Sequence, residues 1–178
     1  MQTVIALGTF DGMHLGHRAV ISRAVDEAHR LNAQAMVYTF STIPRALFHE
    51  APKMLMTAEE KKNEILKMGV QRVEMVEFTD EIAQMSPEAF VKMLFMNYHP
   101  CAIVAGEDYS FGHKARGNME MLRKYAKEMG FEVITVDTVR VKMPDGSYGD
   151  KISSTDIRKA MEKNQISLAE HLLKGEIL

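Results

Sequence analysis

The sequence predicts an α/β protein whose core is a doubly wound parallel sheet of about five strands, folded as a single domain over residues 1–178. The candidate strands are nearly continuous apolar runs such as "VIAL" and "AIVA". Such runs are typical of a parallel sheet that is covered on both faces. Candidate helices separate successive strands, which is the order that a doubly wound sheet requires.

Each element follows from its apolar pattern and its flanking residues. We expect strands at residues 3–8, 33–40, 73–78, 101–106 and 131–137. We expect the helices between and after them at 14–32, 57–69, 86–98, 118–130 and 154–164, with a shorter one at 167–174.

Two of these helices carry clear end signals. Thr57 is placed to cap the helix at 57–69, Glu60 completes a capping box, and Gly69 suits the position just past its end. Ser86 caps the next helix, and Pro87 occupies its first turn, where a missing N–H costs nothing.

Composition limits the classes of function. A net charge of −2 argues against a protein that coats nucleic acid, because a phosphate backbone requires a basic surface, yet it allows a local site for a small anion. No apolar run is long enough to span a membrane, and the N-terminus lacks the basic region of a signal peptide. The single cysteine, Cys101, fits a cytoplasmic protein without disulfide bonds.

The stretch "TFDGMHLGH" follows the first strand and opens the first helix. It holds Asp11, two glycines, Gly12 and Gly16, and two histidines, His14 and His17. Taken alone, it is compatible with a turn, a metal site or a phosphate cradle. No further metal ligands stand at the spacing of an HExxH-type site, whereas free N–H groups at a helix N-terminus favour an anion.

The loop "GEDYSFGHKARG" follows the fourth strand, over residues 106–117. A loop of about a dozen residues in a compact domain is usually functional or disordered, and Tyr109 and Phe111 argue against disorder. An aromatic ring can stack on a flat ligand, while Asp108 can accept a hydrogen bond from a ribose or a base.

The segment "KISSTDIR" offers a second anion cradle at the start of the last long helix. Ser153 and Ser154 are good capping residues, and Arg158 projects from the same first turn as Ser154. Two anion cradles and one aromatic loop at one sheet edge suggest a nucleoside triphosphate as ligand. Neither the P-loop pattern nor the G-x-G-x-x-G dinucleotide fingerprint is present.

Together, these motifs resemble one known family. "GTFDGMHLGH" is similar to the G-x-F-D-G-x-H-x-G-H signature of the adenylyltransferase module of bacterial FAD synthetase, within the HxGH nucleotidyltransferases and their Rossmann-like fold. "GEDYSFGHKARG" and "ISSTDIR" resemble its second and third motifs, in the same order. The resemblance runs from residue 3 to about residue 173 and includes no riboflavin kinase domain.

The resemblance implies transfer of AMP from ATP to FMN, giving FAD and pyrophosphate with Mg²⁺ as cofactor. It assigns catalysis to His14, His17 and Arg158, and it names no metal ligand. It assigns the ATP cradle to Gly8, Phe10, Asp11, Gly12, Gly16, Ser154 and Thr155. It assigns the flavin and nucleotide loop to Gly106, Asp108, Phe111, Gly112 and Gly117.

One segment departs from the family pattern. The family usually reads T-F-D-P-H-P after the second strand, whereas this chain reads "TFSTIP", with Ser41, Thr42 and Ile43 in place of Asp, Pro and His. The matching positions are Thr39, Phe40 and Pro44. This departure keeps two alternatives open: a related nucleotidyltransferase with a different phosphate acceptor, and a flavin- or nucleotide-binding module without catalysis.

Overall fold

A five-stranded parallel sheet forms the centre of the computed structural model, which describes residues 1–42, 53–142 and 148–174. The strands are β1 (Thr3–Leu7), β2 (Gln34–Phe40), β3 (Arg72–Val76), β4 (Pro100–Gly106) and β5 (Glu132–Val136). They lie in the order β3-β2-β1-β4-β5, and every pairing between them is parallel. The predicted α/β class and sheet are therefore confirmed.

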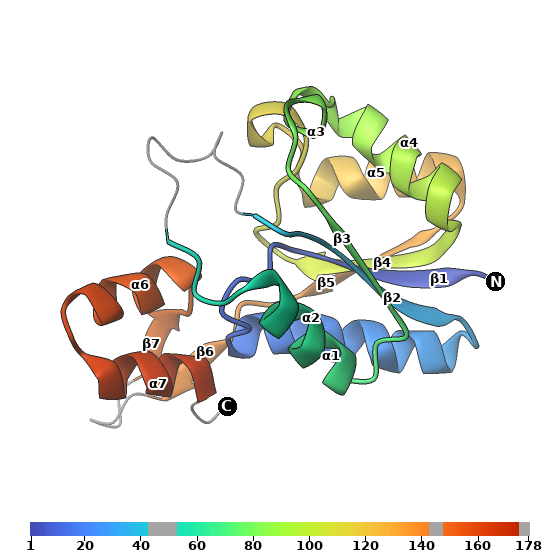
Figure 1. Ribbon diagram of the computed structural model, residues 1–178. Coiled ribbons are helices and arrows are strands. Elements are labelled where there is room, and N and C mark those ends of the chain that lie inside the picture. The colour runs from blue at the N-terminus through green and yellow to red at the C-terminus, as the bar shows by residue number, and fades with distance from the viewer. Residues whose placement is uncertain (43–52, 143–147, 175–178) are drawn as a thin grey trace.

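Helices cover both faces of the sheet (Figure 1). One face carries α1 (Leu15–Arg30) and α2 (Ala58–Lys67), and the other carries α4 (Pro87–Tyr98) and α5 (Met119–Met129). Along β1, Val4 and Ala6 belong to the apolar cluster under α1, whereas Ile5 and Leu7 belong to the cluster under α4 and α5. Burial on both faces explains why the strands are continuous apolar runs.

The predicted helix ends are confirmed. Thr57 and Glu60 form a reciprocal capping box at α2, and Gly69 follows the helix with a φ of 89°. Ser86 accepts a hydrogen bond from the N–H of Ala89 at the start of α4, with Pro87 in the first turn. The predicted helix at 118–130 is α5, capped by the side chain of Asn118.

The chain after β5 adds a small lobe at the carboxyl ends of the strands (Figure 1). Two short antiparallel strands, β6 (Arg140–Lys142) and β7 (Tyr148–Lys151), precede α6 (Ser154–Glu162) and α7 (Ile166–Lys174). A separate apolar cluster joins Ile157 of α6 and Leu172 of α7 to Leu15 at the start of α1. This cluster attaches the lobe to the first turn of α1, where the predicted anion site begins.

Three short elements were not predicted: the β6–β7 hairpin, α3 (Asp80–Gln84) and a 3-10 turn at His113–Ala115. Each is too short and too polar to carry a clear hydrophobic period. The structure adds them to the predicted order without disturbing it.

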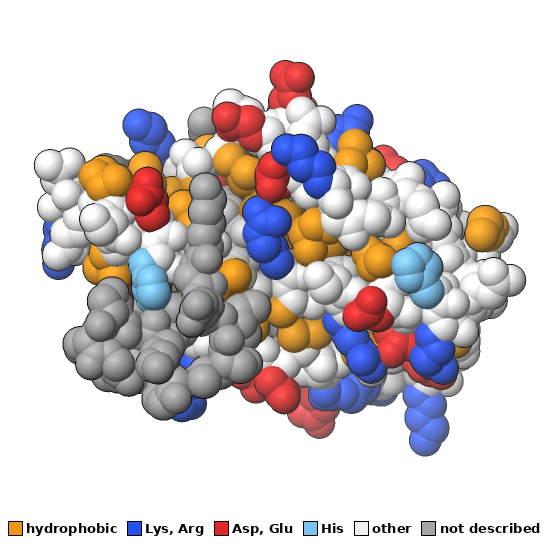
Figure 2. Space-filling view, turned by 90° about the horizontal axis from the view of Figure 1, so that it is seen from below, with side chains coloured by type: hydrophobic (Ala, Val, Ile, Leu, Met, Phe, Trp, Pro, Cys, Tyr) orange, Lys and Arg blue, Asp and Glu red, His pale blue; other side chains and the backbone are white. Residues whose placement is uncertain are grey.

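The face covered by α1 and α2 shows no concentration of one charge (Figure 2). Basic and acidic side chains are interspersed there, and apolar side chains appear in small separate groups. Across the described ranges, no helix is long and apolar enough to cross a membrane. The chemically distinctive region is instead at the carboxyl edge of the sheet.

Candidate active site

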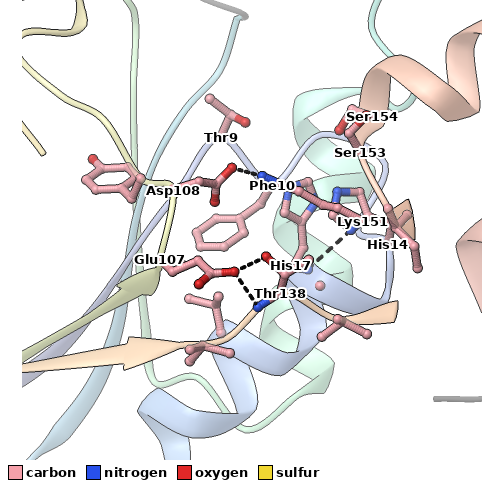
Figure 3. Close-up of a pocket in the computed structure, with 18 of the residues that line it drawn as sticks. Thr9, Phe10, His14, His17, Glu107, Asp108, Thr138, Lys151, Ser153 and Ser154 are labelled. Carbon is pink, nitrogen blue, oxygen red and sulfur yellow. Dashed lines mark hydrogen bonds and ion pairs between the residues drawn. The ribbon is translucent and has the colours of Figure 1, made fainter. Parts of the chain in front are cut away.

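A cavity of about 310 Å³ opens at the carboxyl ends of β1 and β4, between which the strand order reverses. Its walls come from four segments far apart in the chain: the β1–α1 loop, the loop after β4, the segment after β5 and the start of α6 (Figure 3). In open α/β sheets this reversal point is where ligands bind. The predicted motif loops therefore meet here.

His14 and His17 lie together at the N-terminus of α1. His14 is the N-cap residue, and its Nδ1 accepts a hydrogen bond from the backbone N–H of His17 at 3.4 Å. The two imidazoles stack with ring centroids 3.6 Å apart, and the ring of Phe10 meets His17 edge-on at 5.5 Å. Both histidines line the cavity, as predicted for a pair on one face of the first turn.

Both imidazoles are held in the neutral state. Burial, together with the nearby Lys151 cation, lowers the pKa of His14 to about 4. Burial also lowers the pKa of His17 well below its usual value, with smaller contributions from His14 and Lys61. A neutral imidazole still carries one N–H donor, and because Nδ1 of His14 accepts, its proton must be on Nε2.

The buried Nδ1 of His17 has no hydrogen-bond partner within the described part of the chain. Such atoms are rare in folded proteins, because an unpaired buried polar group costs free energy. A ligand in the cavity can supply the missing partner.

Asp11 connects the first motif to the third. Its carboxylate is 2% exposed, accepts a hydrogen bond from the N–H of Leu55 at 3.0 Å and pairs with the guanidinium of Arg158, itself 12% exposed. Arg158 also donates to the carbonyl of Lys53 at 2.8 Å, and the Ser154 hydroxyl donates to the Asp11 carbonyl at 2.7 Å. The structure thus pairs Arg158 with Asp11, and neither of these residues lines the cavity. Ser154 contacts Asp11 and also lines the cavity.

The remaining residues of the predicted ATP cradle divide by position. Gly8, Phe10 and Gly16 line the cavity, whereas Gly12 and the exposed Thr155 do not. A Cβ on Gly8 would lie 2.7 Å from the Phe10 ring, and one on Gly16 would lie 3.2 Å from Cε1 of His14. The glycines therefore allow the Phe10 and His14 rings to approach the backbone closely.

The loop after β4 separates this cavity from a second one. Gly106 and Asp108 line the first cavity, whereas Phe111 and Gly112 line the second. Gly117 lines neither, and it exchanges two backbone hydrogen bonds with Phe111 that close the loop.

The second cavity is smaller, about 80 Å³, and is largely apolar. The rings of Phe40 and Phe78 meet edge-on at 5.0 Å, and Phe90 and Phe111 contribute further aromatic surface. The two cavities share a wall formed by Gly8, Thr9, Tyr109 and Ser110. A ligand with a flat ring fits such a slot chemically, because aromatic faces stack.

Gly112 is expected to be sensitive to substitution. Its φ of 72° disfavours any other residue, and an added Cβ would lie 2.7 Å from the backbone nitrogen of Pro87. We expect Gly112→Ala to lower the free energy of unfolding by about 1–3 kcal/mol more than Gly130→Ala does. Gly130 is the matched control, since its φ is 83° but no atom lies within 4 Å of the added Cβ. Equal losses in urea denaturation would contradict the predicted contact.

Sequence reasoning missed several polar residues at the site. Lys151 of β7 pairs with Asp108 across the cavity, and Glu107 accepts a hydrogen bond from the N–H of Thr138 at 3.0 Å (Figure 3). Lys61 of α2 donates to the carbonyl of Thr9, the first residue of "TFDGMHLGH". Sequence reasoning assigned no role to Lys61, because a lysine in the first turns of an amphipathic helix is usually exposed.

No group of three or more His, Cys, Asp or Glu side chains in the described residues is arranged to hold a metal ion. The segment "TFSTIP" ends β2, where the N–H of Ser41 donates to the carbonyl of Val76 at 2.8 Å. Ile43 and Pro44 lie outside the described residues.

The fold and the site define a doubly wound α/β protein with a histidine-lined cavity at the reversal point of its sheet. A model of the family described as FAD synthetase matches residues 1–156. The chain belongs to the FAD synthetase family.

Curated relatives agree with this assignment. Over 173 residues the chain is 39% identical to the bifunctional riboflavin kinase/FMN adenylyltransferase of Listeria monocytogenes, covering 96% of this chain and 53% of that protein. A protein of the same description from Escherichia coli is 32% identical, with the same two coverages. The chain therefore spans about half the length of these relatives. A putative enzyme of this kind from Geobacillus thermodenitrificans is 31% identical, covering 92% of this chain and 84% of that protein.

Solved structures share the fold. A crystal structure from Streptococcus pneumoniae, described as a macrolide-efflux protein, gives a TM-score of 0.81 at 28% identity, covering 97% of this chain and 55% of that one. Pantothenate synthetase from Thermus thermophilus gives a TM-score of 0.52 at 20% identity, covering 96% of this chain and 70% of that one, which supports the fold alone.

Proposed function

We propose that this chain transfers AMP from ATP to FMN, producing FAD and pyrophosphate. The observation that carries the proposal is the pair of adjoining cavities. One is polar, with two neutral imidazoles at a helix N-terminus, and the other is lined by aromatic rings. ATP suits the first cavity, and the flat ring of a flavin suits the second. The α-phosphate of ATP and the phosphate of FMN would then meet at the shared wall.

In this reaction an oxygen of the FMN phosphate attacks the α-phosphorus of ATP. The new P–O bond forms as the bond to the β-phosphate oxygen breaks, and pyrophosphate leaves with that electron pair. The FMN phosphate is already an anion at neutral pH, so no general base is required. Catalysis then consists of in-line positioning and stabilisation of the charge on the phosphoryl oxygens.

The residues at the cavity are suited to these two tasks. His14 and His17 would donate hydrogen bonds to the ATP phosphates from their neutral rings, beside the free N–H groups that begin α1. Lys151 would add a cation on the opposite wall, and the Ser154 hydroxyl could donate there only by leaving the Asp11 carbonyl. Arg158 would act on the triphosphate only by leaving Asp11, and otherwise it stabilises the loop that carries His14.

Mg²⁺ fits this donor set as an ion that is carried largely by the ATP phosphates. Such an ion needs only one or two carboxylates from the protein, and Glu107, Asp108 and Asp137 line the cavity. When bound, it would neutralise phosphate charge. We further propose that residues 1–178 act as one domain, in the cytoplasm, with these small molecules rather than nucleic acid as partners.

The proposal is tested by mixing the chain with ATP, Mg²⁺ and FMN, and measuring pyrophosphate release together with FAD formation. Riboflavin, which lacks the phosphate, is the negative control. Pyrophosphate release with another phosphate acceptor but not with FMN would identify a related nucleotidyltransferase, which the altered "TFSTIP" segment makes the second candidate. ATP binding without pyrophosphate release would identify a binding module.

The aromatic cavity makes a separate prediction about the acceptor. Phe78 contributes a half-buried ring that meets the ring of Phe40. We expect Phe78→Ala to raise the KM for FMN by roughly tenfold, the scale of one lost aromatic contact, and to leave the KM for ATP unchanged. Steady-state kinetics with each substrate varied in turn measures both constants. A change in the KM for ATP alone would place the flavin elsewhere.

A further inference from the structure

Lys61 is a buried lysine whose hydrogen-bond partners are backbone carbonyls. It is 1% exposed, and its ammonium group donates to the carbonyl of Thr9 at 2.9 Å and to the carbonyl of Phe40 at 2.6 Å. Burying a cation costs free energy, and here burial lowers the pKa of Lys61 to about 8. An apolar side chain would fill the same space without that cost, so packing alone does not account for this residue.

The two carbonyls belong to the ends of neighbouring strands, at the boundary between the two cavities. Thr9 follows β1 and lines both cavities, whereas Phe40 ends β2 and lines only the aromatic one. The hydroxyl of Thr39 donates to the same Thr9 carbonyl at 2.9 Å. Lys61 and Thr39 together therefore fix the shared wall relative to the aromatic cavity.

The position of Thr9 also affects the histidine pair. The next residue, Phe10, has a positive φ of 50°, and its ring forms a T-shaped contact with the ring of His17. A shift of the Thr9 carbonyl would rotate the adjoining peptide, and with it the ring that supports His17. Lys61 lines neither cavity, so it acts through these neighbours and not by touching a substrate.

We propose that Lys61 is a positioning residue for the transfer reaction, and that it sets the alignment of the two cavities by holding the carbonyls of Thr9 and Phe40 together. This inference rests on the proposed function, because in-line attack demands that the two phosphates be correctly placed. A misplacement of about 1 Å can cost on the order of 10²-fold in rate.

The test compares Lys61→Met with Lys62→Met, an exposed neighbour on the same helix. We expect Lys61→Met to lower kcat on the order of 10²-fold without raising the KM for ATP, and Lys62→Met to leave both unchanged. Thermal unfolding of each variant shows whether it is folded. An unchanged kcat in folded Lys61→Met would overturn the proposal, as would a raised KM for ATP with normal kcat.

Two further measurements each cover one way in which this test could fail. Thr39→Val serves if Lys61→Met does not fold, and the NMR signal of His17 serves if the chain makes no FAD. Thr39→Val removes the other donor to the Thr9 carbonyl, and it should lower kcat in the same way. The ring-proton NMR signal of His17, identified by its loss in His17→Gln, should shift in Lys61→Met but not in Lys62→Met. If the His17 signal does not move in Lys61→Met, the positioning role of Lys61 is overturned, whatever the substrate. If the unmodified chain forms no FAD, only the proposed function is rejected.

Discussion

Replacement of His17 by alanine is expected to lower the turnover number by roughly 10²–10³-fold, the scale of losing one preorganised donor to the reacting phosphates. His17 is the central member of the site: it stacks on His14, meets Phe10, and has a buried Nδ1 without a partner in the described residues. The alanine methyl group cannot donate the hydrogen bond that the neutral imidazole would donate to the phosphates. A water molecule in the space left by the ring would be a less well oriented donor.

Steady-state turnover of FAD formation measures this effect. His29→Ala is the control, because His29 is exposed in the last turn of the same helix. A His17→Ala enzyme with the turnover of the unmodified chain would reject the assigned role.

The second large effect concerns stability. Asp11→Ala is expected to lower the free energy of unfolding by about 3–5 kcal/mol, because it leaves the largely buried guanidinium of Arg158 without its charge partner. The N–H of Leu55 also loses its acceptor. We expect this loss to exceed that of any single exposed charge on α1.

Urea denaturation of Asp11→Ala against Asp26→Ala, an exposed acid on α1, measures the difference. The double variant Asp11→Ala/Arg158→Met should recover part of the loss, because it removes the unpaired cation. If Asp11→Ala is no less stable than Asp26→Ala, the pair contributes little and Arg158 is free to serve another role.

The sheet could be predicted from sequence because local and global signals agree. The three central strands, β1, β2 and β4, are buried on both faces, so their apolar character appears without alternation. The caps at Thr57 and Ser86 set helix starts by local hydrogen bonds. The β6–β7 hairpin was missed because its strands are short. Its site residue, Lys151, was missed with it.

The motif loops were predicted to meet, and the structure brings residues from all three to one cavity. The predicted contacts were less complete. Nothing in "KISSTDIR" indicates that Arg158 pairs with Asp11, because that contact depends on how the lobe docks. Lys61 illustrates the same limit, since only the packing of α2 against the strand ends buries it.

The contacts between Asp11 and α6 also bear on how the chain folds during synthesis. Asp11 pairs with a residue 147 positions later, and its carbonyl accepts from a residue 143 positions later. The N-terminal part of a chain emerges first, so β1 and α1 are made long before α6. Until then the Asp11 carboxylate has no arginine partner, and its burial is unfavourable. The carboxyl edge of β1 should therefore remain hydrated until translation passes Arg158, so that the site would form in the last stage of folding.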